Sequence, residues 1–269
     1  MEELVANTRE RRRKSMIKIE NVVLPSIQQW TAVIRGMRNP MNSWDKSDSG
    51  MGCERTRHGF IRGARMCSCC EASNDSHYIC DGMQKFLVGK DDLNLMKNLV
   101  TAGSDHAKFM RMITVYADIT APLYWWKEYD TYKVGTVANS CSTMHKIAAK
   151  EFTLDDFSCE HLMQDAEGWN IEEEYAEGES PLAVLEYTIA VLNFYRKKYL
   201  KTKDKRYWWQ MIQLLPSSYN QRRTVELNYE VLRNMCRKGR RLDHKLDEWR
   251  EFCKWMIETL PGFKEVIGV

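Results

Sequence analysis

The sequence lacks the features of membrane, secreted and nucleic-acid-coating proteins. No apolar run reaches the roughly 18–20 residues that a membrane-spanning helix requires. Residues 1–14 contain no apolar stretch of the signal-peptide type. The 40 Lys and Arg nearly balance the 37 Asp and Glu, so the strong basic excess of proteins that coat nucleic acid is missing. We therefore expect a cytoplasmic protein with no membrane partner, and a nucleic-acid partner is disfavoured.

Common nucleotide-binding and hydrolase motifs are also absent. There is no glycine-rich phosphate loop ending in Lys and Ser or Thr, and Gly50 and Gly52 lack the third glycine of a dinucleotide fingerprint. Neither His-Glu-x-x-His nor Gly-x-Ser-x-Gly occurs. A nucleotide cofactor, if this protein binds one, is therefore not held by the common doubly wound fold.

The composition is that of a folded protein with a sizeable core. Apolar residues make up 43% and charged residues 29% of the 269 residues, which argues against disorder. Helix patterns outnumber strand patterns, and the strand patterns fall in the first half, which favours the α+β class. We expect strands over 17–23 and 109–120. We expect helices over 26–37, 91–103, 123–132, 142–149 and 182–199. Apolar residues also follow helical spacing at Val225, Tyr229, Leu232 and Cys236, and again from Leu246 to Leu260.

Residues 51–85 differ from the rest and suggest an insertion within a single domain over 1–269. They hold five of the nine cysteines and two of the six histidines. An odd number of cysteines cannot form a fully paired disulfide framework within one chain. The pairs Cys67-x-x-Cys70 and His77-x-x-Cys80 supply four ligands of the kind that structural zinc requires. A surface insert with reduced thiols is the alternative, because the linker between the pairs is shorter than in most zinc fingers.

Charge is unevenly distributed in the second half of the chain. Residues 151–180 contain eleven Asp or Glu and no Lys or Arg, and residues 196–206 carry seven basic side chains. The acidic segment predicts a solvated loop, with a basic partner as the alternative. The basic run, the basic residues 8–14 and the cysteine cluster together also allow another function, that of a zinc-stabilised nucleic-acid adaptor.

Residues 91–141 carry the first part of a resemblance to a known family. A helix pattern closes at Gly103, His106 precedes a strand pattern, and Ala121 and Pro122 open a helix that reads APLYWWKEYDTYKVGTVANSC. The second part follows in the order Leu215-Pro216, Tyr219, the block TVELNYEVLRNMCR ending at Arg237, then His244 and Trp249.

Together these stretches, roughly half of the chain, resemble the flavin-dependent thymidylate synthases. Their motifs read A-P-x-x-x-x-R-Q-x-x-R-H-R-x-x-S-x-N-E-x-S and L-P, Tyr, T-V-N-A-R-S-L-x-N-F-L-x-L-R, H-A-Q-W-E. The signature Arg-His-Arg is replaced by Thr131, Tyr132 and Lys133, which removes two guanidinium forks suited to phosphate. The family arginine ahead of Leu-Pro falls at Ile212, although Arg206 lies upstream.

The resemblance implies a fold, a set of ligands and a role for individual residues. The implied fold is helix-rich α+β with a small, mainly antiparallel sheet, assembled as a homotetramer. FAD is the implied cofactor, with folate and NADPH as co-substrates and a deoxyuridylate-type nucleotide as substrate. The implied flavin contacts are His106, Tyr132, Lys133 and Asn228, the nucleotide contacts are Glu128, Thr136, Asn139 and Cys141, and Arg237 polarises the base.

Two functions remain open on this scaffold. The first is flavin-dependent methylation of the nucleotide, in which the protein supplies positioning and electrostatics. The alternative is a non-catalytic nucleotide- or partner-binding protein, because a fold does not fix a function.

Overall fold

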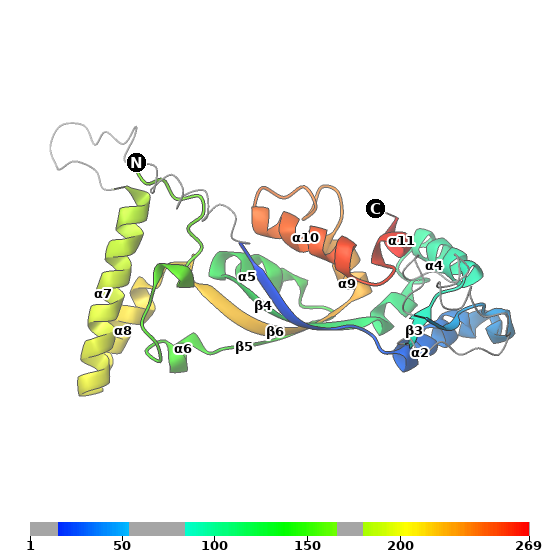
Figure 1. Cartoon of the computed structure of the whole chain (residues 1–269), viewed down its shortest axis with the longest axis horizontal. Helices are drawn as coiled ribbons and strands as arrows, with labels where there is room; N and C mark the ends of the chain where they lie inside the picture. Colours follow the sequence, from blue (N-terminus) through cyan, green and yellow to red (C-terminus); the bar gives the residue numbers. More distant parts are fainter. Residues whose placement is uncertain (1–15, 54–83, 166–179, 269) are drawn as a thin grey trace. The chain divides into compact units, whose positions relative to one another are not determined.

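The computed structural model describes residues 16–53, 84–165 and 180–268 (Figure 1). The candidate zinc ligands Cys67, Cys70, His77 and Cys80 lie outside these residues, as does most of the insertion predicted over 51–85. Within the described ranges no three His, Cys, Asp or Glu side chains are grouped to hold a metal ion. Among the same residues, no helix combines the length and the apolar character needed to cross a membrane.

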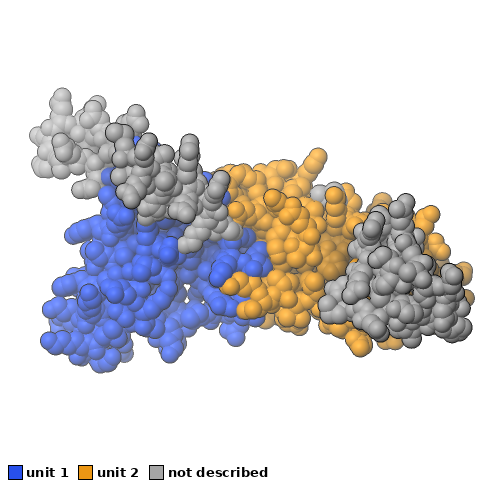
Figure 2. Space-filling view, viewed as in Figure 1, with its two compact units in different colours: residues 1–19, 118–131, 138–224 blue, residues 20–117, 132–137, 225–269 orange. Residues whose placement is uncertain are grey.

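The chain divides into two compact units, which we describe one at a time (Figure 2). The first comprises residues 1–19, 118–131 and 138–224, and the second residues 20–117, 132–137 and 225–269. A four-stranded sheet has the order β1 (Lys18–Val23), β4 (Thr114–Pro122), β6 (Asn220–Asn228), β5 (Thr136–Ser140).

Helices make up most of the remainder of each unit. The first unit contains α5 (Leu123–Tyr129), α6 (Thr143–Lys146), the 3-10 turn η5 (Leu154–Asp156), α7 (Pro181–Thr202) and α8 (Lys205–Leu214). The second contains α2 (Ile27–Arg38), η1 (Asn39–Met41), η2 (Trp44–Lys46), the hairpin strands β2 (Gly50–Cys53) and β3 (Gln84–Leu87), α4 (Lys90–Ala102), η3 (Lys108–Met112), α9 (Tyr229–Met235), α10 (Asp247–Thr259) and α11 (Phe263–Ile267).

Three helices confirm the predictions made from apolar spacing and capping residues. The helix predicted over 26–37 is α2, where Ser26 and Gln29 form a capping box. The helix predicted to end at Gly103 is α4. The amphipathic helix predicted over 182–199 is α7, and its predicted stripe of Leu185, Ile189 and Leu192 is buried. These helices are long and strongly periodic, so local spacing was sufficient to identify them.

Three expectations were wrong. The helical spacing from Val225 is not one helix, because β6 runs to Asn228 and only α9 after it is helical. Residues 109–112 belong to η3 rather than to a strand. The acidic segment is not solvated throughout, because Phe152 and Phe157 are buried and pack with α7 in the core of the first unit. Spacings of three to four residues fit a strand followed by a helix as well as they fit one helix.

Antiparallel pairing of β2 with β3 brings the two ends of the insertion together. Gly50 lies opposite Leu87, and Cys53 lies opposite Gln84 at the end of the hairpin. A short turn can therefore join Cys53 to Gln84 directly.

Replacing residues 54–83 with a short Gly-Ser turn should leave the rest of the protein folded. A shorter connection costs less loop-closure entropy, so the free energy of unfolding should change by no more than about 2 kcal/mol. Urea unfolding of the shortened and full-length proteins measures this. A shortened chain without a cooperative transition would show that the insertion is needed for folding.

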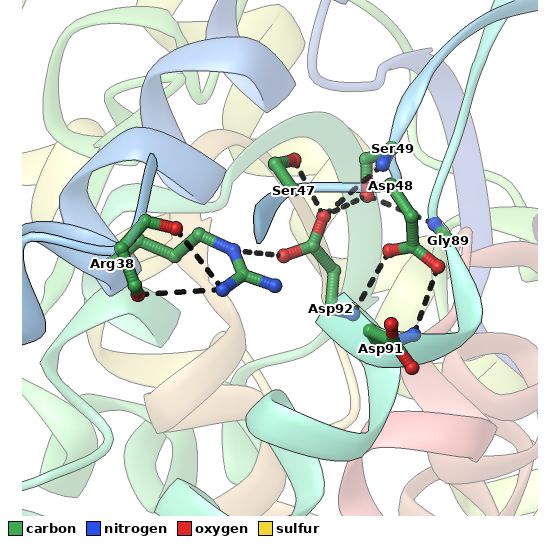
Figure 3. A network of polar contacts seen from close by, with 8 residues as sticks. Arg38, Ser47, Asp48, Ser49, Gly89, Asp91 and Asp92 are labelled. Carbon is green, nitrogen blue, oxygen red and sulfur yellow. Dashed lines mark hydrogen bonds and ion pairs between the residues drawn. The ribbon is translucent and has the colours of Figure 1, made fainter. Parts of the chain in front are cut away.

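A polar network in the second unit joins the loop after α2 to the start of α4 (Figure 3). The fully buried Asp92 carboxylate accepts from Arg38 Nε at 2.6 Å and from the hydroxyls of Ser47 at 2.7 Å and Ser49 at 2.5 Å. Arg38 Nη1 also donates to the carbonyl and hydroxyl of Ser43. The paired charges satisfy each other, as buried charges must.

Asp48 caps α4 from a distance. The N-cap residue Gly89 has no side chain, and the Asp48 carboxylate accepts from the amides of Asp91 at 2.9 Å and Asp92 at 3.1 Å. A Cβ at Gly89 would overlap this carboxylate. Burial raises the pKa of Asp48, but the hydrogen bonds from these amides and the charge of Arg38 outweigh burial and hold the pKa below its ordinary value.

Replacing Asp48 with alanine should destabilise the protein by about 1 kcal/mol at neutral pH. Folding lowers the pKa of this carboxyl, so its charged form stabilises the fold at any pH above the unfolded pKa of about 4. This stabilisation is lost as the pH falls through the lower pKa of the folded state. The difference between wild type and variant should therefore shrink in acid. Urea unfolding at several pH values measures it, with exposed Asp45→Ala as the control, and a difference independent of pH would exclude the carboxylate cap.

Candidate functional site

A small cavity in the first unit is lined by Cys141, a predicted nucleotide contact. We call it the Cys141 cavity, and its volume is about 240 Å³. Its walls come from the start of β6, from α6 and the residues after it, and from η5. Three cations line it, namely Lys146, Lys150 and Arg222, together with the carboxylates Asp155 and Asp156.

Backbone and side-chain bonds hold the wall at Cys141 in place. The Cys141 amide donates to the Arg222 carbonyl at 3.1 Å, and Gln221 Nε2 donates to the Cys141 carbonyl at 3.1 Å. The Ser142 hydroxyl then caps α6 by accepting from the amide of His145. The exposed Cys141 side chain is thus fixed beside the first residues of β6.

The charges around this cavity are partly compensated. Arg222 pairs with Asp118 at 2.6 Å, and Lys150 pairs with Asp156. Burial, together with the nearby Asp156 and Cys141, raises the pKa of the Tyr219 phenol. Tyr219 also lines the cavity, so it remains protonated at neutral pH. The cavity therefore offers cations and a neutral phenol to an anionic ligand.

The second unit contains a cluster of rings around one arginine, which we call the Arg241 cluster. Arg241 Nε donates to the Tyr132 hydroxyl at 3.0 Å, and Nη1 lies 3.0 Å from His244 Nε2. The guanidinium is 4.5 Å from the centre of the Trp249 ring and 5.5 Å from that of Tyr132. Such contacts orient a guanidinium more firmly than solvent does.

The other predicted site residues of the second unit differ in exposure and in hydrogen bonding. His106, Lys133 and Arg237 are exposed. Asn228 caps α9 through Oδ1, which accepts from Val231 N at 3.0 Å, and its Nδ2 donates to the Gly135 carbonyl at 3.1 Å. The Thr136 hydroxyl donates to the Tyr132 carbonyl at 2.8 Å. Tyr132 and Thr136 are thus brought together.

Arg237 is not on the helix that the sequence pattern predicted. Helix α9 ends at Met235, and Arg237 follows in a bend, where its amide donates to the Met235 carbonyl at 2.9 Å. Of the predicted contacts in the first unit, Cys141 lines the cavity, Asn139 is exposed on β5, and Glu128 is half-buried on α5.

Sequence reasoning missed Arg222 and Arg241. Arg222 belongs to the pair Arg222-Arg223 directly before the Thr-Val of the second motif, and Arg241 to the basic run after Arg237. Both arginines stand in basic segments that are visible in the sequence, but neither belongs to the family motif. Their contacts with Asp118 and Tyr132 join residues more than 100 positions apart in sequence.

Comparisons with known proteins identify the fold. No protein-family profile matches the chain, and no curated protein does. Among solved structures, the flavin-dependent thymidylate synthase ThyX of Helicobacter pylori, complexed with FAD and dUMP, is 13% identical, with 92% of this chain and 97% of that one covered and a TM-score of 0.52. The UMP/dUMP methylase PolB of Streptomyces cacaoi, bound with 5-Br dUMP, is 14% identical, with 95% and 96% covered and a TM-score of 0.53. The chain therefore has the α+β fold of the flavin-dependent thymidylate synthases.

Proposed function

We propose that the protein binds a deoxyuridylate-type nucleotide at the Cys141 cavity and methylates it with a folate one-carbon unit and a reduced flavin. The observation that carries this proposal is the set of cations around Cys141. The family resemblance assigns a nucleotide contact to Cys141. A ThyX structure that shares the fold holds FAD and dUMP.

Arg222 and Lys146 are the cations we assign to the nucleotide phosphate. Arg222 lines the cavity and presents a planar fork that matches phosphate oxygens. Lys146, exposed on α6, adds a second positive charge. Together they would replace the family arginine that is lost at Ile212. The resemblance also assigns nucleotide contacts to Asn139 and Glu128 of the first unit and, separately, to Thr136 of the second unit, and it assigns the polarisation of the base to Arg237.

The donors of the Arg241 cluster suit a flavin. A guanidinium matches a pyrophosphate, and the half-buried Tyr132 offers the flat ring that the resemblance assigns to the cofactor. Lys133 and His106 are exposed and would add contacts, and Asn228 would fix the backbone at Gly135. FAD, when bound, supplies hydride chemistry. The proposal includes NADPH as reductant and a homotetrameric, cytoplasmic enzyme.

Protection of Cys141 from alkylation tests the nucleotide site. Without ligand, iodoacetamide should modify the exposed Cys141 readily, and dUMP should slow this reaction at least about tenfold if it fills the cavity. Cys236 and Cys253 are the internal reference, because both are buried. The hydrogen bond that the Cys253 thiol donates to Cys236, together with burial, also raises the pKa of Cys253. Mass spectrometry of the peptides measures each rate, and equal labelling of Cys141 with and without dUMP would contradict the proposal.

A binding protein without catalysis is the second candidate. Two observations favour it, namely the exposed position of Arg237 in a bend and the absence of the Arg-His-Arg triplet. That protein would bind dUMP and protect Cys141 but would form no thymidylate with folate, flavin and NADPH.

A further inference from the structure

The side-chain amide of Gln221 is a polar group of the Cys141 cavity that has no role so far in the proposed function. Gln221 lies at the start of β6, lines the cavity and is 8% exposed. Its Nε2 donates to the Cys141 carbonyl at 3.1 Å, and its Oε1 accepts from Arg223 Nε at 2.9 Å. The amide therefore joins Cys141 to Arg223 along the wall of the cavity.

These two neighbours fix the orientation of the Gln221 amide. A backbone carbonyl accepts hydrogen bonds and does not donate them, so the end of the amide that faces Cys141 is the nitrogen. A guanidinium only donates, so the end that faces Arg223 is the oxygen. Both neighbours thus require the same orientation, with the donor nitrogen on the side of Cys141.

Arg223 is itself held by two contacts. Residues two apart on a strand point to the same face, which places the Arg223 side chain beside Gln221. Its Nη1 donates to the Asp130 carboxylate at 2.8 Å, and its guanidinium lies 4.3 Å from the centre of the buried Trp126 ring. The ion pair and the cation–π contact together keep Arg223 Nε directed at Gln221.

One hydrogen of the Gln221 amide nitrogen has no partner in the described part of the first unit. A side-chain amide nitrogen carries two hydrogens, and the Cys141 carbonyl takes one of them. Because Gln221 lines the cavity, the second hydrogen is available to a ligand there. Such a donor selects a ligand with an acceptor at that place, because a ligand with an N–H group would leave two donors facing each other.

We propose that Gln221 selects the base of the nucleotide through a hydrogen bond from Nε2 to the 4-carbonyl oxygen of a uracil ring, and that Arg223 is the positioning residue that keeps this donor in place. Cytosine carries an amino group where uracil carries this oxygen, so it presents a donor instead of an acceptor. This selection rests on the proposed function, because the nucleotide occupies the same cavity. The cations of the cavity contact only the phosphate and do not distinguish dUMP from dCMP, so the choice of base falls to Gln221.

Calorimetric titration of the full-length protein with dUMP and with dCMP tests this selection. The wild type should bind dUMP at least about tenfold more tightly than dCMP, the usual effect of one hydrogen bond to a buried group. Gln221→Leu should remove most of this preference, and Gln221→Glu, which has nearly the same shape but only accepts, should favour dCMP. The measured quantity is the ratio of the two affinities, because a charge added by Glu acts on both phosphates alike.

Replacing Arg223 tests its positioning role. Arg223→Met should lower the ratio of dUMP to dCMP affinity about as much as Gln221→Leu, because the amide is then free to turn over and present its oxygen to the cavity. Arg223→Lys, which keeps a donor, should recover part of the ratio. A merely structural effect would weaken both nucleotides and leave the ratio unchanged.

Gln210→Leu is the matched control. Gln210 Nε2 also donates to a backbone carbonyl, that of Arg206 at 3.2 Å, but Gln210 lies on α8 and does not line the cavity. Its replacement should leave the ratio unchanged.

Equal affinity of the wild type for dUMP and dCMP, or an unchanged ratio in the Gln221 variants, would overturn the proposal. Thermal melting shows whether each variant folds, and Gln221→Glu keeps the test decisive if the leucine variant does not. A wild type that binds neither nucleotide would contradict the proposed function itself and this selection with it, so the two failures are distinguishable.

Discussion

Replacing Asp92 with alanine should lower the free energy of unfolding by about 3–5 kcal/mol. The change leaves the Arg38 guanidinium, which is 5% exposed, without its carboxylate. It also removes the acceptor of the Ser47 and Ser49 hydroxyls. A buried charge without a partner is among the most costly defects in a protein core. Urea unfolding of the wild type and the variant measures the loss.

The neighbouring Asp91 supplies the matched control. Its side chain is exposed, so Asp91→Ala should change the free energy of unfolding by no more than about 1 kcal/mol. A double change of Arg38→Met with Asp92→Leu should recover much of the loss, because it removes both charges together. Equal effects of Asp92→Ala and Asp91→Ala would show that the buried pair does not hold α2 to α4.

Replacing Arg222 with alanine should weaken dUMP binding by about 10- to 100-fold, the range for a hydrogen bond to a charged group. The variant keeps the backbone contact with Cys141, because only the Arg222 carbonyl makes it. The ion pair with Asp118 is half-exposed on the arginine side and contributes little stability. Calorimetric titration with dUMP measures affinity, and thermal melting should change little.

Arg206→Ala is the control for this experiment. Arg206 is also paired with an aspartate, Asp204, but is largely exposed and does not line the Cys141 cavity. Its replacement should leave dUMP binding unchanged. If the two arginine variants bind dUMP equally, Arg222 is not a phosphate ligand and the nucleotide lies elsewhere.

The sequence alone was sufficient to predict those elements whose signals are local. The capping residues of α2, the stripe of α7 and the glycine that ends α4 all act within a few residues, so their patterns can be recognised in the chain alone. Strand β6 was missed because its buried Val225 also fits helical spacing with the residues of α9. A strand is fixed by its neighbours in the sheet, and these come from distant parts of the sequence.

The candidate site was predictable only where the family motif could be followed. The resemblance pointed to Cys141, and the structure places it beside a cavity. It gave no indication of Arg222 or Arg241, because their surroundings depend on contacts between distant segments. The buried pair of Arg38 and Asp92 was missed for the same reason, since the two residues are separated by 54 positions.

Product analysis of a complete reaction tests the proposed methylation most directly. The purified protein is incubated with dUMP, methylenetetrahydrofolate, FAD and NADPH, and the nucleotide is analysed by mass spectrometry, with the same mixture lacking FAD as the control. We expect thymidylate only when FAD is present, and a large loss of product with Arg222→Ala. Tight binding of dUMP with no thymidylate in the complete mixture would contradict the enzymatic function and leave a nucleotide-binding protein on this fold.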